Sequence, residues 1–532
     1  MRSLLLALLA LPALALAQGS LTPAAAPAPT MKTLAQIEPR IPLGTPGQTT
    51  TTPLVISSSG SYILTGRITI TAGDAITINA SDVTLDLGGF TLSSSETIPT
   101  GSGIVLAPSV RNITIRNGII RGNVVFAVGS FAGTGFANGI YSVSTANTVV
   151  EDVAVRGVAQ HGIFYVGIIR NCSASVCGDR SLQAESVTNS RADTCGNYGI
   201  RGATLENCSA TMTTGGTAIL ATHTATDCYG STTGGTGVSA LTATNCSGVS
   251  ATGTGIAATN VANCRRVSSS GTGISAITVS NSSGQSTSDT GLDATSASNC
   301  SGDSTSGIGL RALTANDCHA TTDTGAYGLF AIHTAQNSRG TIATGGATAS
   351  YALYAKTALN CVGNIDTVVP TPATCYGLYA YAAANCYATS PTGYGLRAAF
   401  TATNCYGASP SGAGLDASTA DACYGSSTSG YGLRANLASN SHGYTVSCTG
   451  LVGALAATNC SGQSTSGIGL SARNASNCFG QSTSGDYGLL AYGTANGCTG
   501  QRVGGVAIAG NIAIGCTSGG GTIESLNRYN MP

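Results

Sequence analysis

Short stretches in which apolar and polar residues alternate recur along most of the 532-residue chain, and Gly-rich and Ser/Thr-rich segments separate them. The hexapeptides IRNCSA (169–174) and LENCSA (205–210) are two examples. A period of two is typical of a β-strand that buries one face, and no window keeps a helical period for long. The hydrophobic pattern therefore predicts an all-β protein built from many short strands.

A cysteine, usually preceded by Asn or Asp, recurs mostly every 18 residues, as from Cys228 to Cys246 to Cys264. A Gly-apolar-x-Ala segment such as GISA (273–276) precedes most of these cysteines. A fixed period with two or three short strands predicts a β-solenoid, in which equivalent residues of successive coils stack at roughly 4.8 Å. The recurring position is held by Cys172, Cys208, Cys228, Cys246, Cys264, Cys300, Cys318, Cys361, Cys386, Cys405, Cys423, Cys460, Cys478, Cys498 and Cys516, and by Ser190, Ser282, Ser338 and Ser441.

The two residues of each Asn-Cys pair have different predicted roles. Asn tolerates bends, and its side-chain amide can both donate and accept hydrogen bonds. We therefore expect stacked Asn side chains to hydrogen-bond from coil to coil. The next residue is expected to point inward, into a slot that takes Cys or Ser and so favours a small side chain.

Residues 53–122 contain the segments GSY (60–62), VTLDLGG (83–89) and NITIRNG (112–118). These segments resemble the opening coils of right-handed parallel β-helix proteins of the pectate-lyase-like superfamily, which includes polysaccharide lyases, hydrolases and adhesins. We therefore expect a single right-handed parallel β-helix of about 22 coils with about 18 residues in each. Longer coils are expected near the N-terminus, because the matching segments that start at Val83 and Ile113 are 30 residues apart.

The chain divides into five predicted segments. Residues 1–17 have an Arg followed by an apolar run and a small-x-small end, which predicts a signal peptide. Residues 18–40 are a Pro/Ala-rich linker and N-terminal cap, 41–150 the longer coils, 151–520 regular coils of 18–20 residues, and 521–532 a C-terminal cap. The protein is expected to be secreted, in an extracellular, periplasmic or cell-surface location, without membrane insertion after cleavage.

Charge and cysteine content narrow the classes of partner. Charged residues make up 8% of the chain, and basic and acidic residues are equal in number, which argues against nucleic acid or an anionic membrane as the partner. The 19 cysteines are expected to be mostly buried free thiols. Cys177 and Cys195 fall outside the repeating position and are the best candidates for a disulfide. The sequence contains no CxxC pair and no cluster of Cys with His, so it predicts no metal site.

Acidic and basic residues are densest in 151–206. If the protein is an enzyme, the resemblance implies a lyase or hydrolase of acidic polysaccharides, and the candidate catalytic residues are Asp152, His161, Asp179 and Arg191. A Ca²⁺ ion would be needed only by a lyase, and no other cofactor is expected. The alternative is that these residues form solvated rim loops with salt bridges.

Two sets of aromatic residues recur at equivalent positions of successive coils. Alternation predicts that these side chains point outward, where rings stack on sugars or contact proteins; the alternative is that they stack on one another. The leading hypothesis is a non-catalytic protein that binds polysaccharide or another surface, and its oligomeric state stays open. The two sets are Phe330, Tyr354 and Tyr379, in Gly-apolar-x-Ala, and Tyr387, Tyr406 and Tyr424, after the Cys position.

Hydroxyl residues and charges form two further surface patterns. Thr224 and Thr226, followed by Thr242 and Thr244, begin interrupted Thr-x-Thr rows, which resemble the ice-binding face of insect-type antifreeze solenoids and make ice binding a minor alternative. Thr also simply favours exposed strand positions. Asp293 with Arg311, and Arg397, Asp416 and Arg434, are predicted to form surface ion pairs between neighbouring coils.

Overall fold

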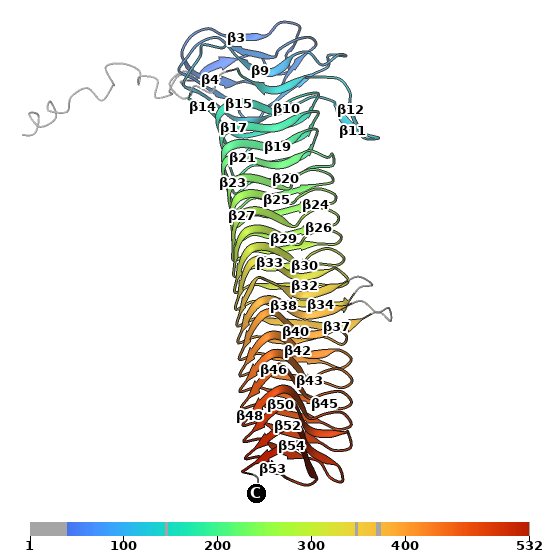
Figure 1. The fold of residues 1–532 in the computed structure, drawn as a ribbon. Coiled ribbons are helices and arrows are strands. Elements are labelled where there is room, and N and C mark those ends of the chain that lie inside the picture. The colour runs from blue at the N-terminus through green and yellow to red at the C-terminus, as the bar shows by residue number, and fades with distance from the viewer. Residues whose placement is uncertain (1–39, 144–146, 346–348, 369–373, 531–532) are drawn as a thin grey trace, which may run out of the picture.

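The protein is an elongated parallel β-solenoid of the right-handed type, with about 25 turns and about 19 residues per turn (Figure 1). The computed structural model describes residues 40–143, 147–345, 349–368 and 374–530. The predicted signal peptide and nearly all of the predicted linker lie outside these residues. Within the described ranges there is no helix, and hence none that is long and apolar enough to cross a bilayer. The predicted fold class is confirmed.

A regular turn contains one long and one short strand. In one such turn the long strand is β40 (Tyr394–Thr403) and the short strand is β41 (Tyr406–Ser409). Both pair in parallel with the strands of the next turn, β42 (Ala413–Asp421) and β43 (Tyr424–Ser427). Equivalent residues therefore lie directly beside one another, as Leu396 lies beside Leu415 and Tyr406 beside Tyr424.

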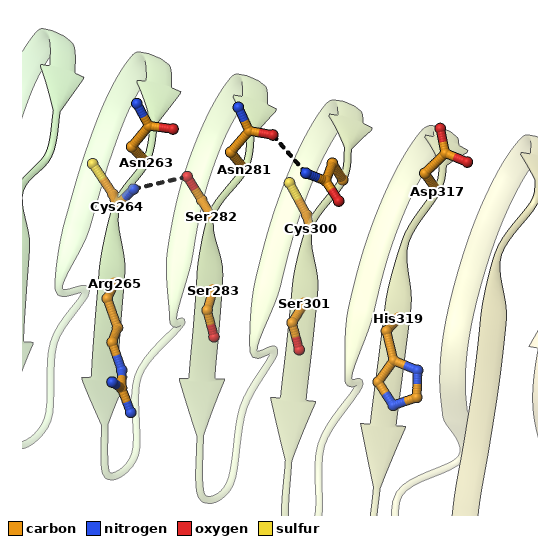
Figure 2. A pocket seen from close by; sticks show the side chains of 11 residues that line it. Asn263, Cys264, Arg265, Asn281, Ser282, Ser283, Cys300, Ser301, Asp317 and His319 are labelled. Atoms are coloured by element: carbon orange, nitrogen blue, oxygen red, sulfur yellow. Dashed lines mark hydrogen bonds between the residues drawn. The ribbon is translucent and has the colours of Figure 1, made fainter.

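Asparagines form the bend between the long and the short strand. Asn281 and Asn299 have φ values of 49° and 53°, in the left-handed region that Asn tolerates better than most residues. The Asn299 amide donates to the Oδ1 of Asn281 over 2.7 Å, so the bends of neighbouring turns are joined (Figure 2). The same bond joins Asn207 to Asn189 and Asn404 to Asn385. The predicted amide ladder is confirmed.

Cysteine and serine are interchangeable in the inward slot because both make the same hydrogen bond. The Cys264 thiol donates to the carbonyl oxygen of Ala262 over 3.2 Å, and the Ser282 hydroxyl donates to that of Ser280 over 2.7 Å. The Ser282 hydroxyl also accepts the backbone N–H of Cys264, which extends the contact between the turns (Figure 2). All cysteines of the repeating position are buried and free in the structure.

Turn length varies more than the sequence pattern predicts. The predicted 18–20-residue coils over 151–520 are interrupted where Asn360 bonds Asn337, 23 residues away, and Asn385 bonds Asn360, 25 residues away. Here β34 (Arg339–Gly345) and β37 (Val362–Val368) extend outward and share a small separate core of Ile342, Ala352, Ile365 and Cys375. The total of about 25 turns also exceeds the expected 22, because the irregular N-terminal turns lack the Asn-Cys pair.

The N-terminal turns differ in their interior. Strands β7 (Val83–Asp86) and β10 (Ile113–Arg121) pair in register, and their core side chains are large aliphatic residues such as Leu85 and Ile115. A hairpin of β11 (Val125–Ala127) and β12 (Ser130–Ala132) leaves the stack after β10 and lies beside it (Figure 1). At the other end, β54 (Thr522–Tyr529) pairs with β52 (Val506–Ile514) and so adds one more strand to the stack.

Candidate binding surfaces

The residue that follows the inward Cys or Ser slot begins the short strand and faces outward. On ten successive turns these residues form one continuous row, which we call the short-strand row, and none of its members is buried. The row is polar at one end and aromatic at the other. Its members are Arg265, Ser283, Ser301, His319, Arg339, Val362, Tyr387, Tyr406, Tyr424 and His442.

The polar end of the row forms a shallow groove of about 500 Å³ (Figure 2). The long side chains of Arg265 and His319 stand at its two ends, and the short side chains of Ser283 and Ser301 lie between them. The bend residues, Asn281 among them, line one side. The groove therefore presents hydroxyl, amide and guanidinium groups along the solenoid axis, a set suited to a hydroxyl-rich ligand.

The aromatic end of the row is a stack of rings. The ring centroids of Tyr387 and Tyr406 are 4.7 Å apart, those of Tyr406 and Tyr424 5.2 Å, and those of Tyr424 and His442 5.1 Å, with planes within 20° of parallel. The rings cover one another's faces, as the alternative interpretation of the sequence expected. Tyr387, at the end of the stack, keeps 46% of its surface exposed. It is the one exposed ring of this stack, and its other neighbour in the row is the smaller side chain of Val362.

A second set of rings lies on the long strands and forms what we call the long-strand plate. Its inner row, Tyr327, Tyr351, Tyr376 and Tyr394, has centroid distances of 5.2, 4.7 and 5.3 Å. Its outer row contains the predicted residues Phe330, Tyr354 and Tyr379, at 5.1 and 5.3 Å. The two rows meet edge to face, as Tyr376 meets Tyr379 at 5.6 Å and 85°. Burial and the neighbouring phenols raise the pKa values of Tyr351 and Tyr354.

Charged residues continue the outer row of the plate. Arg397 lies 5.1 Å from the ring centroid of Tyr394, and its Nε is 3.7 Å from the Asp416 carboxylate. Arg434 makes a two-pronged contact with the same carboxylate, with both bonds at 2.9 Å. These three residues line a groove of about 380 Å³. Together with the bidentate contact of Arg311 with Asp293, they confirm the predicted ion pairs between turns.

The structure separates the two predicted aromatic sets. Phe330, Tyr354 and Tyr379 lie on long strands, whereas Tyr387, Tyr406 and Tyr424 lie on short strands beyond the Asn bend. The inner row of the plate was missed in the sequence, although the recurring Tyr-Gly before the buried Leu of a turn is a signal for it. The polar groove could not be foreseen, because it depends on which long side chains flank short ones on neighbouring turns.

The four candidate catalytic residues lie at two different corners of the turns. Asp152 has a φ of 55° and occupies the bend position that Asn171 holds in the next turn. Arg191 starts β18 (Arg191–Cys195), two residues after the bend at Asn189. His161 and Asp179 lie in connecting loops at the other end of the short strands. The structure therefore brings only His161 and Asp179 together.

His161 and Asp179 form a partly buried pair. The His161 Nδ1 is 3.5 Å from the Asp179 carboxylate, and the imidazole stacks on Phe164 with centroids 4.2 Å apart. Burial lowers the pKa of His161, and the carboxylate of Asp179 opposes this shift without cancelling it. Arg180 lies beside Asp179 at 3.6 Å. The His161 Nδ1 makes no hydrogen bond to a described residue, so the pair has the proximity of an acid and a base but not the hydrogen bond that would orient the imidazole.

Cys177 and Cys195, the candidate disulfide pair, are in-register neighbours on β16 (Ser173–Cys177) and β18. Both are buried and unbonded in the structure, and Cys195 contacts the hydroxyl of Ser181. Burial raises the pKa of Cys195 to about 12, so its thiol is protonated at neutral pH. A disulfide between them stays a prediction.

The Thr-x-Thr pairs also lie in register, since Thr224 is beside Thr242 and Thr226 beside Thr244. The next turn replaces them with Asn260 and Ala262, so the regular hydroxyl pattern stops there. No group of three or more His, Cys, Asp or Glu side chains that could hold a metal ion occurs among the described residues.

Fold and surfaces together define a parallel β-solenoid repeat protein with outward aromatic stacks and axial grooves. A scan against protein-family models finds no matching family, and searches of curated proteins and of solved structures find no match.

Proposed function

We propose that the protein is a non-catalytic, secreted or surface-displayed member of the pectate-lyase-like superfamily that binds polysaccharide along the short-strand row. The observation that carries this proposal is the continuity of the row, in which a polar groove and an aromatic stack follow one another along the solenoid axis. A linear polymer of sugars has both kinds of surface, hydroxyl groups and apolar ring faces, and it is extended like the row itself.

Each part of the row has a role in this proposal. Sugar hydroxyls would hydrogen-bond Ser283, Ser301 and the bend amides, and His319 and Arg265 would hold the ends of the bound segment. A sugar ring would stack on the open face of Tyr387, which the remaining rings of the stack support from behind.

A glycan array with the full chain tests the proposal, followed by affinity measurements on the best-bound glycan. Replacing Tyr387 and Tyr406 by Ala is expected to weaken binding about tenfold or more, because the exposed ring and its support are both lost. Tyr492→Ala is the matched control: Tyr492 is a 63% exposed tyrosine on β50 (Tyr487–Asn496), outside both aromatic sets. Unchanged binding in the Tyr387/Tyr406 variant would contradict the proposal.

A polysaccharide lyase or hydrolase acting on acidic polysaccharide is the second candidate, and the His161–Asp179 pair is what favours it. It ranks second because Asp152 and Arg191 lie at another corner of the turns. Reducing-sugar and unsaturated-product assays on uronic acid polymers test it. Turnover that is lost in Asp179→Asn and kept in Asp152→Asn would reverse the ranking.

A further inference from the structure

We infer that two copies of the chain associate side by side, with antiparallel solenoid axes, through the face that carries the long-strand plate. The proposed function leaves this face unused, because it relies on the short strands beyond the Asn bend. On eight successive turns the outer row of the plate and its charged neighbours form one outward row. Its members, in chain order, are Asp293, Arg311, Phe330, Tyr354, Tyr379, Arg397, Asp416 and Arg434.

The centre of this face is apolar and open to solvent. The three aromatic side chains of the outer row are partly exposed. Further along the same long strands lie Ile332, Tyr381 and Phe400, which are 36%, 38% and 62% exposed. The ring centroid of Tyr381 is 6.3 Å from that of Tyr379 and 5.8 Å from that of Phe400, so these residues form one surface with the plate. Contiguous apolar and aromatic surface of this kind is typical of protein–protein contacts.

The charges at the two ends of the row identify the partner as a second copy of the chain. Asp293 and Arg311 precede the aromatic residues, and Arg397, Asp416 and Arg434 follow them. Two copies that meet through the same face are related by a two-fold axis, so the face must be complementary to itself. In an antiparallel pair this axis reverses the order of the turns and keeps each row opposite the same row. The charges must therefore match their own reversed order.

A two-fold axis between the turns of Tyr354 and Tyr379 meets this condition. Counted outward from the axis, the facing residues are two aromatic rings, then a ring and a cation, then two pairs of opposite charge. The symmetry makes each contact occur twice. The facing pairs, with one residue from each copy, are Tyr354 with Tyr379, Phe330 with Arg397, Arg311 with Asp416 and Asp293 with Arg434.

Neighbouring registers lose this match. A shift by one turn in one direction sets Arg311 opposite Arg397 and also Asp293 opposite Asp416. A shift by one turn in the other direction sets Arg311 opposite Arg434. A parallel pair brings together the same turn of each copy, so that every charge meets its own kind. Because like charges that face each other oppose association, the row selects the antiparallel register.

The two ends of the row also differ in net charge. The hydrogen bond and charge of Asp293, with the charge of Asp289, raise the pKa of Arg311, so two carboxylates and one guanidinium group lie at this end. The other end has the carboxylate of Asp416 and two guanidinium groups. The antiparallel register sets an end of net charge −1 against an end of net charge +1 at both edges of the contact.

The apolar residues beside the row fit the same axis, although they did not determine its position. Ile332 lies one turn before the central tyrosine pair and Phe400 one turn after it, so the two face each other. Ile277 lies four turns before the pair and Leu455 four turns after it. They are 54% and 51% exposed and would cover each other in the dimer.

Sedimentation velocity of the full chain tests the inference, and the wild type is expected to sediment as a dimer. Arg311→Asp and Asp416→Arg should each raise the dissociation constant at least tenfold, because each sets like charges opposite each other on both sides of the axis. An equimolar mixture of the two variants should restore a dimer, since the substituted residues then face each other with opposite charge. Arg265→Asp, at an exposed position of the short-strand row, is the charge-matched control.

Lys356 provides a second measurement, because it is exposed and the sequence has only one other lysine, Lys32. In the inferred register the two copies of Lys356 lie about one turn, roughly 4.8 Å, apart along the axis. A short amine-reactive crosslinker should therefore join Lys356 of one copy to Lys356 of the other.

Three results would overturn the inference. The first is a wild type that stays monomeric at its highest soluble concentration. The second is a dimer that both charge variants leave unchanged, which would place the contact on another face. The third is a mixture of the variants that stays monomeric, which would mean that the two positions do not face each other. Glycan binding by the short-strand row is measured separately, so neither outcome decides the other.

Discussion

The turns before residue 150 and those of the cysteine repeat use the same stacking principle with different interiors. The N-terminal turns are filled by large aliphatic residues such as Ile104, Ile113 and Leu85, and successive bends there are 30 and 35 residues apart. The repeat turns are mostly 18 residues apart and are filled mainly by Cys, Ala and one or two Leu, Ile or Val residues per turn.

The length of a turn therefore affects how the binding surface on that turn is formed. A wide turn tolerates an excursion such as the β11–β12 hairpin, and this loop lines a groove of about 760 Å³. The 18-residue turns present their outward residues in strict rows, so their binding surfaces are stacks of equivalent side chains, whereas the 23- and 25-residue turns around Ile342 and Ile365 extend outward. In both regions, amides at left-handed bends keep the register, as Asn112 with Asp82 does near the N-terminus.

The largest expected effect comes from adding volume to the narrow interior. Cys246→Leu should lower the free energy of unfolding by about 2–3 kcal/mol, because the slot between stacked turns cannot expand. Denaturant unfolding followed by circular dichroism measures this. Ile115→Leu in the wide N-terminal interior keeps the volume and should cost less than about 1.5 kcal/mol. Equal effects of the two substitutions would remove the distinction between the regions.

Arg266 breaks the small-residue rule of the repeat turns. It points inward between Gly248 and Gly284, is 2% exposed, and bonds only backbone carbonyls, including that of Gly248 at 3.2 Å. Burial lowers its pKa to about 9, which shows how poorly the site accommodates a charge. Arg266→Gly should therefore raise the free energy of unfolding by about 2 kcal/mol.

The exposed neighbour Arg265 is the control for this substitution. Arg265→Gly should not stabilise the protein, since its charge is already in water. A destabilised Arg266→Gly variant would show that the arginine has a structural role that its carbonyl contacts do not reveal.

Substituting within the cysteine slot should have a much smaller effect. Cys246→Ser should change the free energy of unfolding by less than about 1 kcal/mol, because Ser282 makes the same bond to the carbonyl two residues earlier.

Thiol labelling of the native protein should modify Cys448, which is partly exposed, before any other cysteine. Rapid labelling of many thiols would contradict a closed interior, and two missing thiols after unfolding would indicate one disulfide, for which Cys177 and Cys195 are the predicted pair.

The smallest expected effect is a pH dependence at the end of the aromatic stack. Burial lowers the pKa of His442 below its ordinary 6.5, so the unfolded chain binds a proton more readily than the folded one. Stability should therefore fall as the pH drops below about 6.5. His442→Gln should reduce this fall in a series of thermal unfolding curves, while the remainder comes from His161, whose pKa burial also lowers. An identical pH profile for the variant would contradict this assignment.

Much of the fold was predictable because the same sequence pattern recurs in most of the turns. The Asn bend and the small inward slot can each be recognised within the sequence of one turn. Because the turns stack with a regular period, equivalent residues of successive turns align in rows. The irregular turns were harder to place. The extra length around Ile342 and Ile365 has no counterpart in the other turns, since these residues pack with Ala352 and Cys375 in a cluster separate from the main core.

The binding surfaces divide in the same way. The sequence alone determined that Tyr387, Tyr406 and Tyr424 form one row, because a residue's place in the period decides its place in the stack. Only the tertiary structure decided that Phe330, Tyr354 and Tyr379 belong to a different side, and that Arg121 and Arg156 together line the groove under the β11–β12 hairpin. Those arrangements depend on the bend angles and on loops between turns, which bring together residues whose spacing in the chain follows no period.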